Sequence, residues 1–516
     1  MIGWLRVMAD SAVVHTARFR AWSRVIEVVL LVKPRASKCP MAIPFRRFLL
    51  TSPGSADISD LQGAESMVSR AKSSSKRMRT INTNAAGIDI GSERHYVAVD
   101  PSKCDTAVRN FGCYTPDLEE MARWLIDCGV TTVAMESTGV YWIPVYQVLE
   151  QHGLHLHLVD ARHVKNVPGR KTDVVDCQWL QQLHSYGLLR GCFIPEARIA
   201  VLREYWRHRA CLVESVSREI LHMQKSLEQM NVQLHKVLSD ITGVTGMNII
   251  RAIVAGERRP LVLAGMRERG VKKSESEIMR ALSGNYQEQH LFTLKQALEL
   301  YDVLHAKIAD CDKKIEECLS GFESKVDPRQ ITRKPCKPRR KNQPYFDLNK
   351  ELYRITGVDL TAIDGIDSLT AQTIISEVGF DLSMFASEKH FSSWLALSPE
   401  NRITGGKVRI RRTRKSGNRV ATALRLAAQS LHASKTALGA FFRRVRARKG
   451  APKAVTATAR KLACLVYRML RYGMEYTDLG QQQYEERYQE HQRLLLQKRA
   501  AALGYQLTPL QTGGVS

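Results

Sequence analysis

The spacing of apolar residues changes along the chain and divides it into regions of different structure. Between about 85 and 190, short apolar runs that suit strands alternate with longer amphipathic segments that suit helices. From 195 to 325 the apolar residues recur at helical spacing, with many charges between them. The region 348–475 again predicts mainly helices. We therefore expect an α/β domain, a helical middle and a mainly helical last domain.

The α/β domain is expected over 83–194. Two of its strands, 87–91 and 96–100, flank a short turn and indicate a β-hairpin. The full expected order is strands over 87–91, 96–100 and 106–114, a helix over 116–129, a strand over 130–137, a helix over 140–153, a strand over 154–160 and a helix over 172–188. Three antiparallel strands followed by alternating helices and strands are the order of a ribonuclease-H-like fold.

The helical middle, 195–325, contains two long amphipathic segments, 213–238 and 293–319. Such segments suit an antiparallel helical hairpin or a coiled-coil surface for a partner. An ordinary helical bundle fits the same pattern equally well.

The last domain, 348–475, opens with a glycine turn between two short predicted helices, over 355–379. This segment is similar to a helix-hairpin-helix element, in which the N–H groups of the turn can bind a phosphate. A purely structural helical hairpin is the alternative.

Three further segments lack the pattern of a packed core. Residues 1–82 mix Arg, Ser and Pro without a sustained period and predict a disordered basic extension. A functional basic arm is one alternative, and an upstream translation artefact with the working start near Met67 or Met78 is another. The segment 326–347 is predicted to be a basic, proline-containing linker, and 476–516 a polar helix followed by disorder.

The 516-residue chain carries a formal net charge of +26, and the basic residues are clumped. This charge predicts a polyanionic partner, either nucleic acid or an anionic membrane surface, and the clumping favours nucleic acid over a merely solvated basic surface. No apolar run approaches the roughly 20 residues of a membrane span, and no convincing signal peptide is present, so no membrane partner is expected. The 11 cysteines include no C-x-x-C pair, which indicates reduced thiols in a cytoplasm rather than disulfides or structural zinc.

Four carboxylates occupy positions that would bring them together. Asp89 lies in a glycine-flanked apolar strand, Glu136 ends another, and Asp173 and Asp176 are three residues apart on one face of a predicted helix. If the strands are neighbours and the helix packs across them, the four acids converge. Such a cluster needs divalent cations, Mg²⁺ or Mn²⁺, and two such ions suit phosphodiester chemistry. Any one acid alone fits a surface charge or a helix cap better than a metal ligand.

Basic and aromatic residues near these acids suit a nucleic-acid substrate. Tyr141 and Trp142 follow Glu136 and fit either base stacking or core packing. The basic residues expected to meet phosphates are Arg162, Lys165, Arg170 and Lys171 before the acidic helix, and Arg402, Lys407, Arg409, Arg411, Arg412, Arg414, Lys415 and Arg419 in the last domain.

Thr404 places a hydroxyl in the middle of the second basic group, directly before Gly405 and Gly406. The glycine pair lets the backbone come close to a partner. A hydroxyl in a strongly positive field can act as a nucleophile on a phosphodiester. A plain turn hydrogen bond is the alternative, and local chemistry alone favours it.

Together the segments 87–100, 134–142, 169–181, 363–379 and 401–409 resemble the DEDD transposases of insertion-sequence family 110, the bridge-RNA-guided recombinases. The resemblance covers roughly 85 to 475. It implies a RuvC-like first domain whose catalytic acids are Asp89, Glu136, Asp173 and Asp176, a coiled-coil dimerisation region and a transposase domain carrying a hydroxyl nucleophile. Where the family has a serine before the glycine pair, this chain has Thr404, and Ser398 is a weaker candidate.

The resemblance also implies a mechanism and partners. A structured noncoding RNA would pair with donor and target DNA, and base pairing would supply most of the sequence choice. A composite site between subunits would require a dimer or a tetramer, acting in the cytoplasm at the nucleoid. Two alternatives stay open: an ATP-binding protein of the actin and Hsp70 type, and an inactive nucleic-acid-binding remnant.

Overall fold

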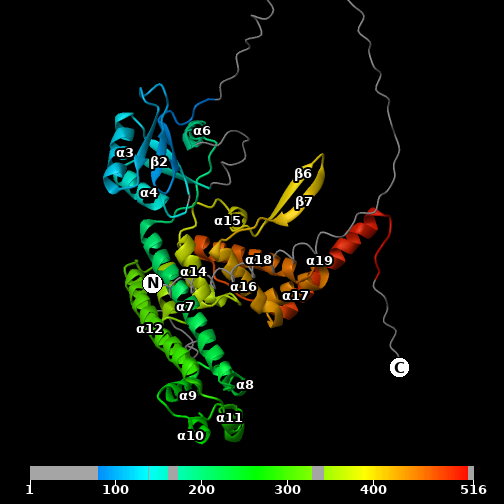
Figure 1. Cartoon of the computed structure of the whole chain (residues 1–516). Coiled ribbons are helices and arrows are strands. Elements are labelled where there is room, and N and C mark those ends of the chain that lie inside the picture. Colours follow the sequence, from blue (N-terminus) through cyan, green and yellow to red (C-terminus); the bar gives the residue numbers. More distant parts are fainter. Residues whose placement is uncertain (1–78, 138, 161–172, 328–341, 509–516) are drawn as a thin grey trace, which may run out of the picture. The chain divides into compact units, whose positions relative to one another are not determined.

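The computed structural model describes residues 79–137, 139–160, 173–327 and 342–508 (Figure 1). Most of the predicted extension 1–82 and of the predicted linker 326–347 lies outside these ranges. The chain divides into two compact units, Met1–Thr83 with Ser185–Gly187, and Asn84–His184 with Leu188–Ser516. In the described part of the first unit, the backbone N–H groups of Ile81 and Asn82 donate to the carbonyl of Ser185 at 2.8 and 3.0 Å.

The α/β domain contains a five-stranded sheet with the order β3-β2-β1-β4-β5. Its strands are β1 (Ala85–Ile90), β2 (Arg94–Ala98), β3 (Val108–Gly112), β4 (Thr132–Glu136) and β5 (His155–Val159). The first three strands pair antiparallel, and β4 is parallel to both β1 and β5. This mixed sheet, with the mainly helical remainder, confirms the predicted fold class of α/β plus α.

The central strands are buried on both faces because helices cover each side. Ile88 and Met135 point into one core, which they share with α3 (Thr115–Asp127) and α4 (Trp142–Gln151). Ala134 points the other way and packs with Leu180 of α6 (Asp173–Ser185). Successive residues of a strand face opposite sides, so Gly87, Asp89 and Glu136 lie on the face that α6 covers.

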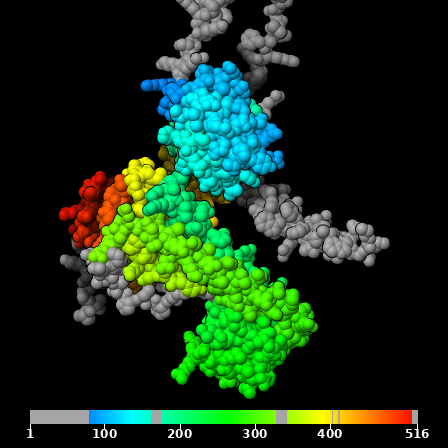
Figure 2. All heavy atoms as spheres, turned by 90° about the vertical axis from the view of Figure 1, so that its left-hand side faces the viewer, coloured from blue at the N-terminus to red at the C-terminus, as the bar shows by residue number. Residues whose placement is uncertain are grey.

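Two long helices form an antiparallel hairpin in the middle of the chain, α7 (Ala197–Gln229) and α12 (Glu288–Ser320). Each has 33 residues, about 50 Å of helix at 1.5 Å per residue. The segment between them forms α8 (Leu234–Val237), α9 (Val244–Val254), α10 (Pro260–Gly265) and α11 (Glu275–Ala281). These short helices share a core with the adjoining ends of α7 and α12 and form a compact green body in Figure 2.

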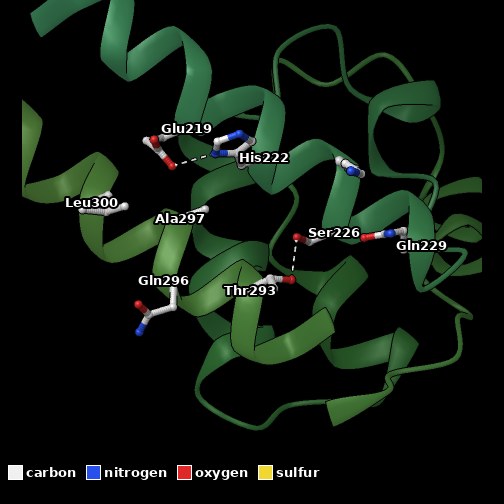
Figure 3. Close-up of a pocket in the computed structure, with 9 residues that line it drawn as sticks. Glu219, His222, Ser226, Gln229, Thr293, Gln296, Ala297 and Leu300 are labelled. Atoms are coloured by element: carbon white, nitrogen blue, oxygen red, sulfur yellow. Dashed lines mark hydrogen bonds and ion pairs between the residues drawn. The ribbon is translucent and has the colours of Figure 1, made fainter. Parts of the chain in front are cut away.

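A pocket lies between α7 and α12 near these short helices (Figure 3). Ser226 of α7 and Thr293 of α12 place their hydroxyl oxygens 3.0 Å apart across it. His222 lies beside Glu219 on α7, with a ring nitrogen 3.1 Å from a carboxylate oxygen. The two helices therefore contact each other through polar as well as apolar side chains.

The last part of the chain is mainly helical with one β-hairpin. Its elements are α13 (Leu348–Thr356), η3 (Leu360–Ala362), α14 (Ser368–Val378), α15 (Glu388–Trp394), β6 (Pro399–Thr404), β7 (Lys407–Thr413), α16 (Arg419–Ser430), η4 (Leu431–Ala433), α17 (Ala437–Lys449), α18 (Ala451–Tyr472) and α19 (Gly480–Ala502). Side-chain caps begin several of them, including Asp367 before α14 and Asn418 before α16.

One hydrophobic core joins this region to the helical hairpin. Ile199 and Trp206 of α7 and Ile315 of α12 belong to the same buried cluster as Leu352 and Val466. Residues on both sides of the predicted linker thus share a core. In the described residues, no helix is both long and apolar enough to cross a membrane.

The buried ion pair between Arg209 and Asp312 ties α7 to α12. Nε of Arg209 lies 2.5 Å from Oδ1 of Asp312, and both residues are at most 4% exposed. Removing one partner of such a pair leaves an uncompensated buried charge. We expect Asp312→Ala to lower the free energy of unfolding by about 3–5 kcal/mol, measured by urea denaturation of the full chain followed by circular dichroism.

The matched control is Asp302→Ala, because Asp302 pairs with Arg251 at 2.6 Å on the surface. Exposed pairs contribute about 1 kcal/mol or less. Equal losses in the two variants would show that burial does not set the contribution of the Arg209–Asp312 pair.

Candidate active site

Asp89 and Glu136 lie side by side at the carboxyl ends of β1 and β4. Ile88 pairs with Met135 in the parallel register, so the next residue of each strand is one of the two acids. Both face the side of the sheet that α6 covers, and Glu136 is only 8% exposed. A carboxylate in such a place needs a cation or hydrogen-bond donors to offset its lost hydration.

The helix α6 packs directly on β1 at Gly87. A Cβ at Gly87 would lie 2.3 Å from the backbone N of Gln181 and 2.5 Å from the carbonyl O of Cys177. The side-chain amide of Gln181 donates to the carbonyl of Ala85 at 3.3 Å. The helical turn Cys177–Gln181 therefore lies against β1 at Ala85 and Gly87, and the preceding turn of α6 begins at Asp173.

The pKa of the Cys177 thiol reflects the charges near the contact between α6 and β1. Burial, followed by the negative charges of Asp89 and Asp176, raises the pKa of the Cys177 thiol to about 12. The buried thiol donates to the carbonyl of Val174 at 3.2 Å within α6. Asp89 and Asp176 are therefore both close to one buried side chain, and Glu136 is the register neighbour of Asp89.

The side chain of Asp173 lies outside the described ones, although its backbone begins α6. Among the described side chains, no three His, Cys, Asp or Glu residues form a group that could hold a metal ion. The donors that are described near this edge are carboxylate oxygens, the ligands that Mg²⁺ and Mn²⁺ prefer. The donor chemistry of Asp89, Glu136 and Asp176 therefore fits a hard divalent cation.

Asp160 is a further acid at this edge that the sequence analysis missed. It follows β5 directly, as Glu136 ends β4. Burial, and then the charge of Asp160, raises the pKa of the Cys192 thiol, which places Asp160 near Cys192. The signal was present in the sequence, because Asp160 ends an apolar predicted strand just as Glu136 does.

The far end of α6 is anchored by a histidine. His184 is buried, and its Nε2 lies 2.9 Å from Oγ1 of Thr132 on β4. The ring of His157 lies beside it, with the ring centroids 4.8 Å apart. Burial, and to a smaller extent the charge of His157, lowers the pKa of His184 to about 4. The imidazole is therefore neutral at pH 7, and nothing in the local sequence pattern marked it.

The two aromatic residues after Glu136 have different surroundings. Trp142 packs edge-on against Tyr146, with ring centroids 5.9 Å apart, and lies against the core of the domain. Tyr141 is 45% exposed. Core packing thus accounts for Trp142, and Tyr141 keeps the surface that base stacking would use.

Thr404 is the last residue of β6 and pairs with Lys407 across a two-residue turn. Gly405 and Gly406 have φ values of +56° and +72°, which suit a type I′ hairpin turn and are unfavourable for other residues. A Cβ on either glycine would meet nothing within 4 Å. The turn conformation therefore accounts for the glycine pair, and it presents the exposed Thr404 at the tip of the hairpin.

The predicted phosphate-binding residues are only partly described. Arg162, Lys165, Arg170 and Lys171 lie outside the described residues, as do the side chains of Arg402 and Arg411. The six others are exposed on β7 and the segment after it: Lys407, Arg409, Arg412, Arg414, Lys415 and Arg419. Two of these also contact the protein, because Arg414 donates to the carbonyl of Ser393 at 2.9 Å and Arg419 lies 3.9 Å from Glu377.

Ser398 lies just before β6 and is half-buried. Its Oγ is 3.2 Å from Oγ of Ser392, which is fully buried in α15. This contact turns the hydroxyl toward the protein interior. Thr404 is thus the more accessible of the two predicted hydroxyls.

The segment 355–379 consists of the end of α13, the short 3₁₀ helix η3, a glycine turn and α14. A Cβ on Gly365, where φ is +89°, would lie 2.8 Å from the carbonyl O of Ala427 in α16. The N–H of Ile366 donates within the turn to the carbonyl of Ile363 at 3.0 Å. Packing against α16 thus accounts for this glycine.

Two family models match the chain. A model described as Transposase, of the DEDD type of IS110, matches residues 86–232, which include the sheet and α6. A model described as Transposase IS116/IS110/IS902 family matches residues 359–443, which include the β6–β7 hairpin. The chain belongs to the IS110 family of transposases. No curated protein matches it.

Membership of this family makes the protein a transposase and DNA its substrate. The first match covers Asp89, Glu136, Asp173 and Asp176, and the second covers Thr404. Neither match supports the alternative of an ATP-binding protein.

Gly87 should be intolerant of any side chain if α6 must approach β1 this closely. We expect Gly87→Ala in the transposase to lower the free energy of unfolding of the α/β domain by about 1–3 kcal/mol, because the added methyl overpacks the contact. Thermal unfolding of the full chain measures this loss. The matched control is Gly191→Ala in the same domain, since the nearest atom to its Cβ would be Nδ1 of His157 at 3.8 Å. Equal unfolding midpoints for the two variants would contradict the close contact.

Acid should weaken the packing of α6. The pKa of His184 is about 4 in the folded protein and 6.5 ordinarily, so the unfolded chain binds the proton first as the pH falls. Stability is unaffected above pH 6.5 and decreases down to pH 4, by up to about 3 kcal/mol. We expect His184→Gln to give a shallower decline of the unfolding midpoint between these pH values. Parallel pH profiles for the variant and the wild type would contradict this assignment.

Proposed function

We propose that this transposase cleaves, exchanges and rejoins DNA strands, using a divalent metal site at Asp89, Glu136, Asp173 and Asp176 and the hydroxyl of Thr404. The observation that carries the proposal is the register of β1 and β4, which makes Asp89 and Glu136 neighbours on the face that α6 covers. The strand order β3-β2-β1-β4-β5 supports assigning this domain to the RuvC-like ribonuclease-H fold.

The four acids would hold Mg²⁺ or Mn²⁺, which when bound supplies Lewis-acid activation of phosphodiester oxygens. The sheet supplies Asp89 and Glu136 from adjacent strands, and α6 supplies Asp173 and Asp176 from its first turn. Their shared negative charge would make the site unfavourable for DNA phosphates until it is neutralised. Arg162, Lys165, Arg170 and Lys171 precede α6 in the chain, and we propose that they bind the DNA backbone.

Thr404 would act as the nucleophile. Its Oγ1 would form a bond to phosphorus while the bridging P–O bond to the sugar breaks, the hydroxyl proton passing to a base and the leaving oxygen accepting a proton. The exposed position at the hairpin tip and the positive charges of Lys407 and Arg409 support this role. The β-methyl group of threonine crowds the approach to phosphorus more than a serine would.

We further propose that a structured noncoding RNA guides the transposase to donor and target DNA. The net charge of +26 supports a protein that binds two kinds of nucleic acid. Arg402, Arg411, Arg412, Arg414, Lys415 and Arg419, together with a helix-hairpin-helix-like element over 355–379, would contact phosphates. A site that combines acids and hydroxyl from different subunits would require a dimer or tetramer, with the helical middle as the coiled-coil contact, at the nucleoid in the cytoplasm.

A second candidate function is an inactive nucleic-acid-binding remnant. Thr404 favours it, since this chain has threonine where the family's serine is expected. The two functions differ in whether any covalent protein–DNA product forms.

Activity of variants tests the proposal. We expect Asp89→Asn and Thr404→Ala to lower excision from a donor plasmid by at least ~10²-fold, because each removes a group that acts on the reacting phosphate. Thr404→Ser should retain or raise activity. A covalent adduct with end-labelled DNA, resolved on a denaturing gel, should form in the wild type and disappear in Thr404→Ala.

Ser398→Ala is the matched control, since it removes the nearby alternative hydroxyl and should leave the adduct intact. Full excision by both Asp89→Asn and Thr404→Ala would refute the proposed site. DNA binding without any adduct, in the wild type and in Thr404→Ser alike, would establish the remnant.

A further inference from the structure

Two cations share aromatic rings where α17, α18 and α19 meet. The guanidinium carbon of Arg444 lies 3.5 Å from the ring centroid of Tyr488 and 4.7 Å from that of Tyr484. Nζ of Lys461 lies 4.8 Å from the ring centroid of Phe441 and 5.2 Å from that of Tyr484. We call these five residues the cation–aromatic cluster.

Among the described residues, neither Arg444 nor Lys461 forms an ion pair with a carboxylate. Nη1 of Arg444 is buried and has no hydrogen-bond partner in the described part of the chain. Burial, and then the charge of Arg444, lowers the pKa of Lys461. The cluster thus holds two like charges that repel each other in a partly desolvated place.

Contacts with the rings offset only part of this cost. A cation over an aromatic ring is attracted by the negative charge density of the ring face. The charge of Arg444 lowers the pKa of the Tyr484 phenol, although burial raises it more. Glu485 beside Tyr484 accepts from the side chain of Gln481 at 3.1 Å.

Further basic residues lie on the two helices that carry Arg444 and Lys461. Arg446, Arg448 and Lys449 are exposed at the end of α17, and Lys453 is exposed at the start of α18. Arg468, also on α18, differs from Lys461 because it forms an ion pair with Glu388 at 2.6 Å. Exposed positive charge therefore gathers where α17 ends and α18 begins.

We propose that the cation–aromatic cluster binds a phosphodiester group of a nucleic-acid strand. Arg444 would donate two hydrogen bonds to phosphate oxygens, which matches the planar geometry of the guanidinium, and Lys461 would contribute a point charge. Tyr484 and Tyr488 would offer ring surface to the adjoining sugar or base. Residues 444–488 follow both family matches, and the site requires neither the metal nor the hydroxyl of the proposed reaction.

Binding of labelled strands to the full chain tests this site. The probes are a mixed-sequence 30-nucleotide single-stranded DNA and an RNA of the same sequence, and fluorescence anisotropy follows their binding over a salt series. We expect Lys461→Met and Arg444→Met each to weaken binding about 5–10-fold and to reduce the slope of log K against log salt by about 0.7. The control is Arg468→Met, which removes one charge from the same helix but from a paired site.

Thermal unfolding of the free protein separates a ligand site from a packing device. If the two cations are held together for an anion, Lys461→Met relieves their repulsion and raises the unfolding midpoint while it weakens binding. If they serve only packing, the midpoint falls and binding matches that of Arg468→Met, which would overturn the proposal. A larger loss of affinity for the RNA probe assigns the phosphodiester to RNA, and a larger loss for the DNA probe assigns it to DNA.

The covalent DNA adduct at Thr404 separates this site from the proposed reaction. If Lys461→Met loses strand binding but still forms the adduct, the cation–aromatic cluster acts independently of the proposed active site.

Discussion

The contact between α6 and β1 at Gly87 controls what the first domain can do. Because glycine has no side chain, the backbone of the helix reaches the backbone of the strand, and the amide of Gln181 can bind the carbonyl of Ala85. This contact fixes the height of the helix along the strand. Asp176 lies in the first turn of this helix, and the charges of Asp89 and Asp176 act on the same buried thiol of Cys177. A larger residue at Gly87 would separate the helix from the strand that carries Asp89.

Much of this domain could be predicted because local patterns determine it. β1 and β4 are apolar on both faces, so an acid inside either strand stands out, and Asp89 and Glu136 could be identified from sequence. Asp173 and Asp176 share a helix face by their spacing alone. The anchoring by His184 could not be predicted, since its partner Thr132 is 52 residues away and has no distinguishing local pattern. Asp160 was missed although it directly follows an apolar strand, one residue beyond Val159, the register partner of Glu136.

In the last domain, less of the functional detail could be predicted from the sequence. Its helices could be predicted, but the role of its glycines could not. Gly405 and Gly406 suggested close approach to a partner, and their left-handed backbone conformation shows that the turn itself requires them. The same turn leaves Thr404 exposed at a hairpin tip with Lys407 opposite it. The sharing of one core by α7, α12 and the last domain depends on contacts between distant residues, such as Ile199 and Leu352, which no periodicity records.

That shared core has a consequence for synthesis on the ribosome. Trp206 of α7 emerges long before Val466 of α18, yet both belong to the same buried cluster. At a translation rate of about 5–20 residues per second, the apolar side of α7 is synthesised on the order of tens of seconds before the residues of α18 that cover it. The sheet, in contrast, has all five strands by Val159. During this interval the nascent chain carries a complete five-stranded sheet followed by α7, whose apolar face is still exposed. The need for a chaperone is therefore greatest between the synthesis of α7 and that of α18.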